Sequence, residues 1–185
     1  MANEKKTVET PVEYDPQYIL QVKDLKKYFP IKGGMISKTV GHVKAVDGVT
    51  FNLKRGTTMG LVGESGCGKT TCGRTCLGMY NKTDGQVLYR GKDVHALKGS
   101  ELFAYKREAQ MVFQDPYASL DPRMKVRDII AEPLETYHVC KTKAETTHRV
   151  LELMQAVGVP AEFLNRYPHQ FSGGQRQRIG IARAL

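Results

Sequence analysis

The sequence predicts an α/β fold for this 185-residue chain. One observation is that the apolar run at 58–62 leads directly into a glycine-rich loop, which a segment compatible with a helix follows from about Lys69 to Tyr80. Another is that short apolar runs bounded by turn residues recur up to residue 113, whereas helical spacing prevails after residue 126. Strands and helices that share one chain of this length favour a single α/β domain.

The first half of the chain is expected to be rich in strands. Asp47-Gly48 is a turn or bulge signal within one of them, Asp84-Gly85 precedes another, and Gly91-Lys92-Asp93 turns the chain again. Three glycines between 30 and 41 predict a loop there, and the stretch 116–122 is expected to be irregular. The predicted strands cover 18–22, 43–53, 58–62, 86–90 and 110–113.

The second half is expected to be helical. The spacing predicts helices over 126–137 and 143–158, and a basic helix runs from residue 173 to the last residue. Gly158-Val159-Pro160 should end the second of these helices. Its apolar face is expected to consist of Val150, Leu151, Met154 and Val157.

Composition sets broad limits on the class of protein. Apolar residues make up 41% of the chain and charged residues 25%, which is ordinary for a globular domain. No apolar run reaches the roughly 18 residues needed to span a bilayer, and the polar first residues carry no secretory signal core. The net charge of +9 is spread along the chain, which is compatible with a membrane surface but favours no single partner.

The four cysteines fit neither a zinc site nor a disulfide framework, so reduced thiols in a cytoplasm are expected. Cys72 and Cys76 lie four residues apart on the predicted helix and should be small core residues. Cys67 lies in the glycine-rich loop, where helix N–H groups favour a thiolate. We hypothesise that Cys67 is reactive and that bound nucleotide protects it.

The glycine-rich loop fits the phosphate-binding pattern G-x-x-x-x-G-K-[ST] without a mismatch. Glycines allow backbone N–H groups to turn toward a phosphate, and the helix that follows adds partial positive charge. Lys69 can reach the outer phosphates and the Thr70 hydroxyl can ligate Mg²⁺. The alternative is a strand-to-helix turn that binds nothing. The loop consists of Gly63, Glu64, Ser65, Gly66, Cys67, Gly68, Lys69 and Thr70.

A second motif, Phe171-Ser172-Gly173-Gly174-Gln175, opens the last predicted helix. Ser172 and Gln175 have the spacing of a capping box, which is a sufficient structural role for them, with Ile179 and Ala182 facing inward. Two glycines in the first turn, however, cost about 1 kcal/mol each relative to alanine. They make sense if a ligand approaches the backbone closely, and exposed N–H groups at a helix start suit an anion.

With these motifs the sequence resembles the ATP-binding subunits of ABC transporters. The phosphate loop corresponds to their Walker A motif, Phe171 to Gln175 to their Leu-Ser-Gly-Gly-Gln signature, and Met111 to Pro116 to their Q-loop. The segments 114–124 and 166–171, together with 30–41 and 73–75, are similar to the oligopeptide and dipeptide importer branch and favour its F-type subunit. Nickel importers share much of this pattern, so the cargo is inferred by analogy.

The resemblance implies a P-loop NTPase of the ABC ATPase type, with a RecA-like core, an antiparallel β edge and a helical subdomain. In that family two subunits sandwich two ATP molecules head to tail. Gly63, Gly66, Gly68, Lys69, Thr70 and Thr71 would hold the phosphates and Mg²⁺, with the rest of the loop around them. Ser172, Gly173, Gly174 and Gln175 would face the γ-phosphate on the partner subunit.

Two further roles follow from the resemblance. Gln114 would help to hold Mg²⁺ and the attacking water, and would link the site to the membrane subunits; otherwise it is the polar end of a strand. Phe29, with Tyr28 as its neighbour, would stack on adenine; otherwise it is a core aromatic residue at a strand end.

The resemblance also implies domain boundaries and an unfinished core. We expect a flexible tail at 1–17, a nucleotide-binding core at 18–110, a Q-loop with the helical subdomain at 111–172, and the start of the signature helix at 173–185. In the family the Walker B strand, the catalytic Glu, the D-loop and the switch His come after this point. We therefore expect a fold that is incomplete at the C-terminus, apolar surface exposed beside 58–62, and almost no hydrolysis by these 185 residues alone.

As a transport subunit the chain would lie on the cytoplasmic face of the inner membrane. Its expected partners are permease subunits, a second ATP-binding subunit (itself or a paralogue) and, indirectly, a peptide-binding protein, but no nucleic acid. The alternatives are a soluble ABC-type ATPase that acts on nucleic acid or ribosomes, and a non-catalytic nucleotide-binding fragment. A small-molecule kinase is disfavoured because it would not need the second motif.

Overall fold

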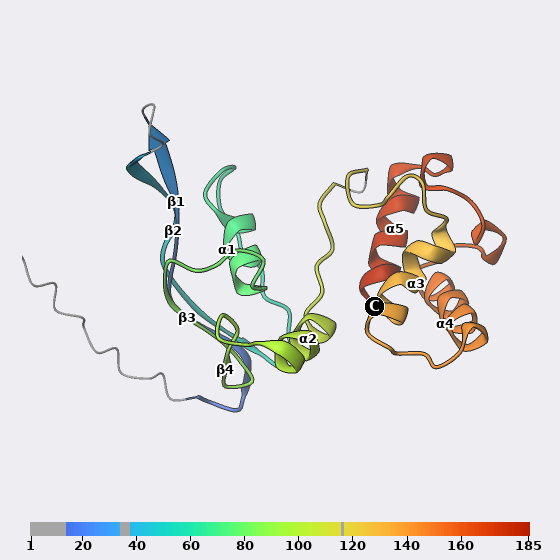
Figure 1. Ribbon diagram of the computed structural model, residues 1–185, viewed down its shortest axis with the longest axis horizontal. Helices are drawn as coiled ribbons and strands as arrows, with labels where there is room; N and C mark the ends of the chain where they lie inside the picture. The colour runs from blue at the N-terminus through green and yellow to red at the C-terminus, as the bar shows by residue number, and fades with distance from the viewer. Residues whose placement is uncertain (1–13, 34–37, 116) are drawn as a thin grey trace, which may run out of the picture. The chain divides into compact units, whose positions relative to one another are not determined.

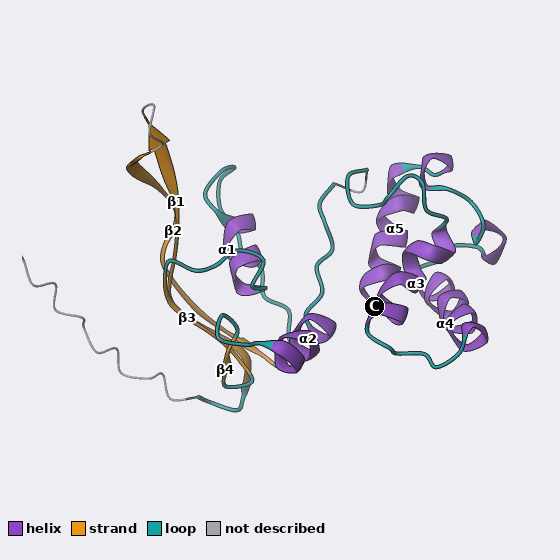
Figure 2. Ribbon diagram, viewed as in Figure 1, coloured by secondary structure: helices purple, strands orange, loops and turns teal. Residues whose placement is uncertain are grey.

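A computed structural model describes residues 14–33, 38–115 and 117–185. These residues form two compact units divided between Leu102 and Phe103. Most of the predicted tail, the centre of the predicted loop at 34–37, and Pro116 lie outside the described residues. Figure 1 colours the chain by residue number. Figure 2 shows that the strands belong to the first unit, whereas the second unit contains helices and loops.

The first unit is built on an antiparallel sheet in the order β2-β1-β3-β4. Its strands are β1 (Tyr18–Gly33), β2 (Lys38–Lys54), β3 (Asp84–Tyr89) and β4 (Lys92–Asp93). β1 and β2 extend well into the segment predicted as a loop, because Pro30↔His42 and Gly33↔Lys38 are still paired across the two strands. The predicted loop at 30–41 was therefore too long.

Turn chemistry shapes this sheet at Gly48, as predicted, and at Arg90-Gly91, whereas Lys92 and Asp93 of the predicted second turn form β4. The register of β1 and β2 shifts between Leu25↔Val49 and Lys26↔Asp47, which leaves Gly48 as the extra residue of a bulge with φ 82°. β3 and β4 are joined by Arg90 and Gly91, both with positive φ, which is the two-residue turn that matches strand twist.

Helix α1 (Lys69–Cys76) packs against β1 and β2. Cys72 and Cys76 are buried, as predicted, together with Val22, Leu25 and Val87 of the sheet. A hydrogen bond with Cys72, together with burial, raises the pKa of the Cys76 thiol. The helix ends four residues earlier than predicted.

The strands predicted at 58–62 and 110–113 are wrong: both segments are irregular. An apolar run becomes a strand only if a neighbouring strand pairs with its N–H and C=O groups. The four-stranded sheet that the structure describes provides no such neighbour. Met59, Leu61 and Val62 are correspondingly exposed, Val62 at 89%, which agrees with the expected apolar surface.

Helix α2 (Gly99–Glu108), which the sequence analysis did not predict, contains the boundary between the units. The second unit continues with α3 (Val126–Thr136), α4 (Lys143–Ala156) and α5 (Gly173–Ala184), and with the short 3₁₀ helices η1 (Ala161–Phe163) and η2 (Pro168–Gln170). The three long helices match their predicted ranges closely. No helix in the described ranges combines the length and the apolar character that a bilayer crossing needs.

One apolar core joins α3, α4 and α5. Ile130, Val150, Met154 and Ile179 are fully buried in it, and Ala182 faces inward as predicted. The buried face of α4 is rotated from the predicted one, because Leu153 is buried whereas Leu151 and Val157 are only half-buried. Gly158, with φ 68°, ends α4 at the expected place.

Candidate functional site

The predicted phosphate loop forms a turn at the start of α1 in the first unit. Gly66 and Gly68 have φ values of 81° and 92°, a region that only glycine adopts easily. A Cβ atom at Gly68 would lie 2.1 Å from the carbonyl oxygen of Ala45 on β2, whereas one at Gly66 would meet open space. Gly68 therefore allows the loop to pack against β2, and Gly66 leaves its outer side accessible.

The ammonium group of Lys69 lies inside this loop. Its Nζ donates to the carbonyl oxygens of Gly63 at 2.8 Å and Glu64 at 2.6 Å, and it lies 3.6 Å from the Sγ atom of Cys67. The backbone N–H of Cys72 donates to the Gly68 carbonyl at 2.8 Å, which begins the helical bonding of α1. A cation thus lies at a helix N-terminus that is already positive, an arrangement that favours an anion.

The remaining loop residues are open to solvent. Glu64, Ser65 and Thr70 are exposed and Thr71 is half-buried. Thr70 is in the first turn of α1, so its hydroxyl is accessible to a ligand on the loop. A hydroxyl oxygen beside a phosphate cradle is a donor type that suits Mg²⁺, which prefers oxygen ligands and keeps several waters.

Phe29 lies on β1 in the same unit and is half-buried. Its ring makes an edge-on contact with Tyr80 at 5.6 Å between centroids, and the Lys27 ammonium lies 4.8 Å from its centroid. The neighbouring Tyr28 instead donates its hydroxyl to Asp47, a contact that lowers the pKa of that carboxyl together with Lys44. The Tyr28 side chain is thus fixed by a hydrogen bond from its hydroxyl, whereas the Phe29 side chain forms no hydrogen bond.

The second predicted motif opens α5 in the second unit. The N–H of Ser172 donates to Gln175 Oε1 at 3.0 Å, and the N–H of Gln175 donates to Ser172 Oγ at 3.4 Å, which completes the predicted capping box. Phe171 is buried and contacts Phe163 edge-on at 5.5 Å. An apolar residue therefore anchors the motif, while Ser172 and Gly174 remain exposed.

Gly173 and Gly174 have different surroundings. A Cβ atom at Gly174 would meet nothing within 4 Å, whereas one at Gly173 would touch the Tyr117 ring at 3.8 Å. Neither glycine has a positive φ, so backbone strain does not explain them. The open side of Gly174 leaves room for a ligand to approach the backbone closely.

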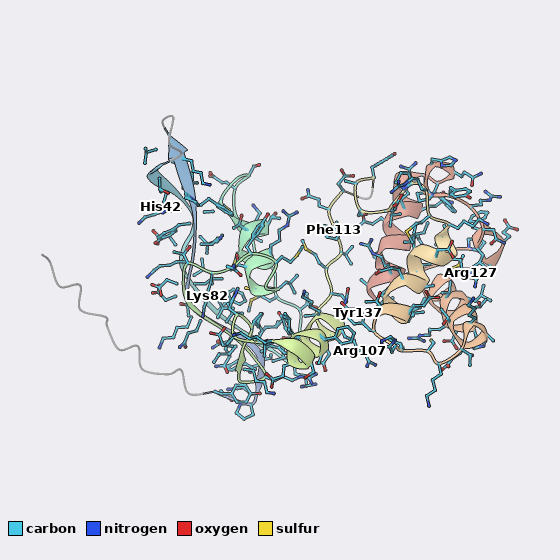
Figure 3. The ribbon with its side chains drawn as sticks, in the orientation of Figure 1. His42, Lys82, Arg107, Phe113, Arg127 and Tyr137 are labelled. Atoms are coloured by element: carbon cyan, nitrogen blue, oxygen red, sulfur yellow. The ribbon has the colours of Figure 1, made fainter. Side chains whose placement is uncertain are left out.

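Gln114 is exposed and lies on the irregular segment between α2 and α3. The label of Phe113, the preceding residue, locates this segment in Figure 3. After it, Asp115 accepts a hydrogen bond from the N–H of Tyr117 at 2.8 Å, and Asp121 forms an ion pair with Arg123 at 3.2 Å that lowers the pKa of Asp121. The first unit thus gathers the loop residues 63–71, and the second contains Gln114 and Ser172 to Gln175.

Sequence reasoning missed two contributors to these motifs. Ala45 constrains Gly68 through its backbone carbonyl, which no side-chain pattern could reveal. Tyr117 lies beside the signature glycine Gly173, in a segment that the resemblance had singled out, but its residue type alone did not indicate this position.

Known proteins resemble this chain over most of its length. The ABC transporter family model, ABC_tran, matches residues 46–185. The chain is 54% identical to the oligopeptide transport ATP-binding protein AppF of Bacillus subtilis, over 90% of this chain and 51% of that protein. It is 53% identical to the dipeptide transport ATP-binding protein DppF of Lactococcus lactis, over 92% and 54%. The chain therefore spans about half the length of these relatives.

Solved structures give the same result for the fold. The ATP-binding cassette MJ0796, in a dimeric post-hydrolysis state bound to ADP and Pi, matches with a TM-score of 0.76 and 29% identity over 90% of this chain and 68% of that one. CbiO1 from Clostridium perfringens, at 24% identity and a TM-score of 0.70, supports the fold alone. The predicted ABC ATPase fold class and the resemblance to peptide-importer ATP-binding subunits are confirmed. This chain belongs to the ABC transporter family.

Proposed function

We propose that the chain is the nucleotide-binding part of an energy-coupling subunit that drives peptide import by binding and hydrolysing ATP. The carrying observation is the phosphate loop, where Gly66 and Gly68 adopt left-handed conformations around the ammonium of Lys69. The named relatives, which are oligopeptide and dipeptide transport ATP-binding proteins, support the choice of cargo class. Because the chain spans about half of those relatives, the activity of the whole protein belongs to this proposal.

In the proposed site the loop binds the phosphates of ATP. Lys69 exchanges its two backbone carbonyl partners for β- and γ-phosphate oxygens, and the N–H groups at the start of α1 hold the same anion. Thr70 would hold Mg²⁺, and Gln114 would be a further ligand. When bound, Mg²⁺ neutralises charge that develops on the phosphates.

Adenine would stack on Phe29. Tyr80 packs edge-on against the Phe29 ring, so a ligand can still stack flat against that ring. Phe29 is only half-buried, which permits access to it. The nearby ammonium of Lys27 lies over the same ring, so it must move aside or lie on the opposite face when a base stacks there.

The signature would act on a second subunit, itself or a paralogue. Ser172, Gly173, Gly174 and Gln175 would approach the γ-phosphate that the partner's loop holds, which produces a head-to-tail pair with two nucleotides. The dimeric state of the MJ0796 structure supports this arrangement. Permease subunits and, through them, a peptide-binding protein would be the remaining partners, at the inner face of the membrane. Co-fractionation with membranes distinguishes this proposal from a soluble ABC-type ATPase.

The first test is nucleotide binding by the purified chain, measured with a fluorescent ATP analogue and Mg²⁺. We expect Lys69→Ala to weaken binding at least tenfold, in line with the loss of a charge-assisted phosphate contact. Ser172→Ala is the matched control, because it lies in the second unit and should leave binding to the loop unchanged in a monomer. Equal affinity of the wild type and Lys69→Ala would overturn the proposal.

A further inference from the structure

The segment that follows Gln114 is held along α5 by two arginines. The guanidinium of Arg176 lies 4.0 Å from the centroid of the Tyr117 ring, and Arg183 donates to the backbone carbonyl of Ser119 at 2.7 Å. These arginines are seven residues apart, which is two helical turns, so they lie on the same face of α5. Leu120 then enters the helical core, where it is 3% exposed.

Arg176 makes a second contact at the point where α5 begins. Its Nε donates to the backbone carbonyl of Phe171 at 3.1 Å, one residue before the cap at Ser172. One guanidinium group therefore contacts the Tyr117 ring and fixes the peptide that leads into the signature. Planar guanidinium groups suit this combination of stacking and a directed hydrogen bond.

Tyr117 also lies beside the signature. A Cβ atom at Gly173 would lie 3.8 Å from Cε2 and 3.9 Å from the hydroxyl oxygen of Tyr117, so the ring lies beside this glycine backbone. The backbone N–H of Tyr117 donates to Asp115, which helps to fix the residue that carries this ring. Tyr117 nevertheless remains 63% exposed, so burial in the core does not explain its position.

We propose that Tyr117 is a positioning residue for the signature: its ring holds Arg176 and Gly173, and thereby fixes the backbone around Ser172 for the γ-phosphate of a partner's nucleotide. This inference rests on the proposed function. Groups that stabilise a transition state must be held within a fraction of an ångström, and misplacement by about 1 Å can cost about a hundredfold in rate. An exposed aromatic side chain on the segment of Gln114 provides such support from outside the core.

The decisive variants are Tyr117→Ala and Tyr117→Phe. In the native subunit assembled with its permease, we expect Tyr117→Ala to lower kcat for ATP about tenfold or more while KM changes less than about twofold, because the phosphate loop is untouched. Tyr117→Phe keeps the ring and should retain kcat within about twofold. A loss of kcat in both variants, or in neither, would overturn the positioning role.

A second measurement on the purified chain needs no activity. Hydrogen exchange of the amides of 173–176 should speed up in Tyr117→Ala and Arg176→Ala, while exchange in α3 and α4 stays unchanged. Arg178→Ala is the matched control. Arg178 lies two residues after Arg176 on another face of α5, and it donates to the Val157 carbonyl at 2.8 Å. If Arg178→Ala has the same effect as Arg176→Ala, or if Tyr117→Ala has none, the proposal fails. If the wild-type subunit does not hydrolyse ATP, the proposed function fails, while the exchange result still decides the role of Tyr117.

Discussion

Cys67 lies within the phosphate loop, beside the ammonium group of Lys69. Its side chain is exposed, and its Sγ atom lies 3.6 Å from the ammonium of Lys69. An exposed thiol in this loop is accessible to a thiol reagent. We therefore predict that a maleimide modifies Cys67 and that saturating ATP with Mg²⁺ slows the reaction about tenfold or more, because the occupied loop excludes the reagent.

The chain contains its own references for this experiment. Cys72 and Cys76 are buried and should stay unmodified in both conditions, and half-buried Cys140, in the second unit, should react at a rate that ATP does not change. Peptide mapping by mass spectrometry assigns the rates. Equal labelling of Cys67 with and without nucleotide would contradict the protection.

The two units differ in how far single residues reveal their contacts. The motif predicts a glycine at position 68, but the reason that no side chain fits there is the backbone carbonyl of Ala45, 23 residues earlier in the sequence. Conversely, Ser172 and Gln175 could be paired from the sequence alone, because a capping box depends only on spacing along one helix. Local chemistry was predictable, and contacts between distant segments were not.

Secondary structure elements follow the same rule. The helices α3, α4 and α5 and the bulge at Gly48 were predicted because periodicity and turn residues act within one element. The irregular segments at 58–62 and 110–113 were predicted as strands, since an apolar run identifies a segment suited to a sheet but not its partner. The extension of β1 and β2 to Gly33 and Lys38 was missed because hydrogen bonds between two strands outweighed the glycine signal.

The cap of α5 allows its structural and functional roles to be separated. Ser172→Ala removes the side chain that accepts the Gln175 N–H and should lower the free energy of unfolding of the second unit by about 1 kcal/mol. Ser172→Asp restores a good cap at a favourable helix end and should recover that stability. Urea unfolding followed by circular dichroism measures both changes.

The function should not recover with the cap. A carboxylate at Ser172 would repel the γ-phosphate of a partner's nucleotide, so Ser172→Asp should remain defective in ATP hydrolysis by the native subunit. If Ser172→Asp regains both stability and hydrolysis, Ser172 acts only as a helix cap.

At the scale of the whole molecule, the two motifs lie in different compact units, and each unit has its own buried side chains. In the proposed head-to-tail pair, the loop of each chain holds one nucleotide, while the signature requires a nucleotide presented by another chain. This division predicts a dependence on protein concentration that no single-residue argument supplies.

We predict this dependence in the hydrogen exchange of the native subunit. With ATP and Mg²⁺ at about 100 times Kd, binding contributes about 2.7 kcal/mol, so amides of the loop and the start of α1 should exchange up to about a hundredfold more slowly at every protein concentration. Amides at 172–175 should gain protection only at concentrations where the subunit dimerises, as followed by light scattering. Lys69→Ala should lose both effects, because a loop without phosphate offers the partner's signature no ligand. Protection of 172–175 in a strictly monomeric sample would mean that the nucleotide contacts both motifs of one chain, which is incompatible with a head-to-tail pair.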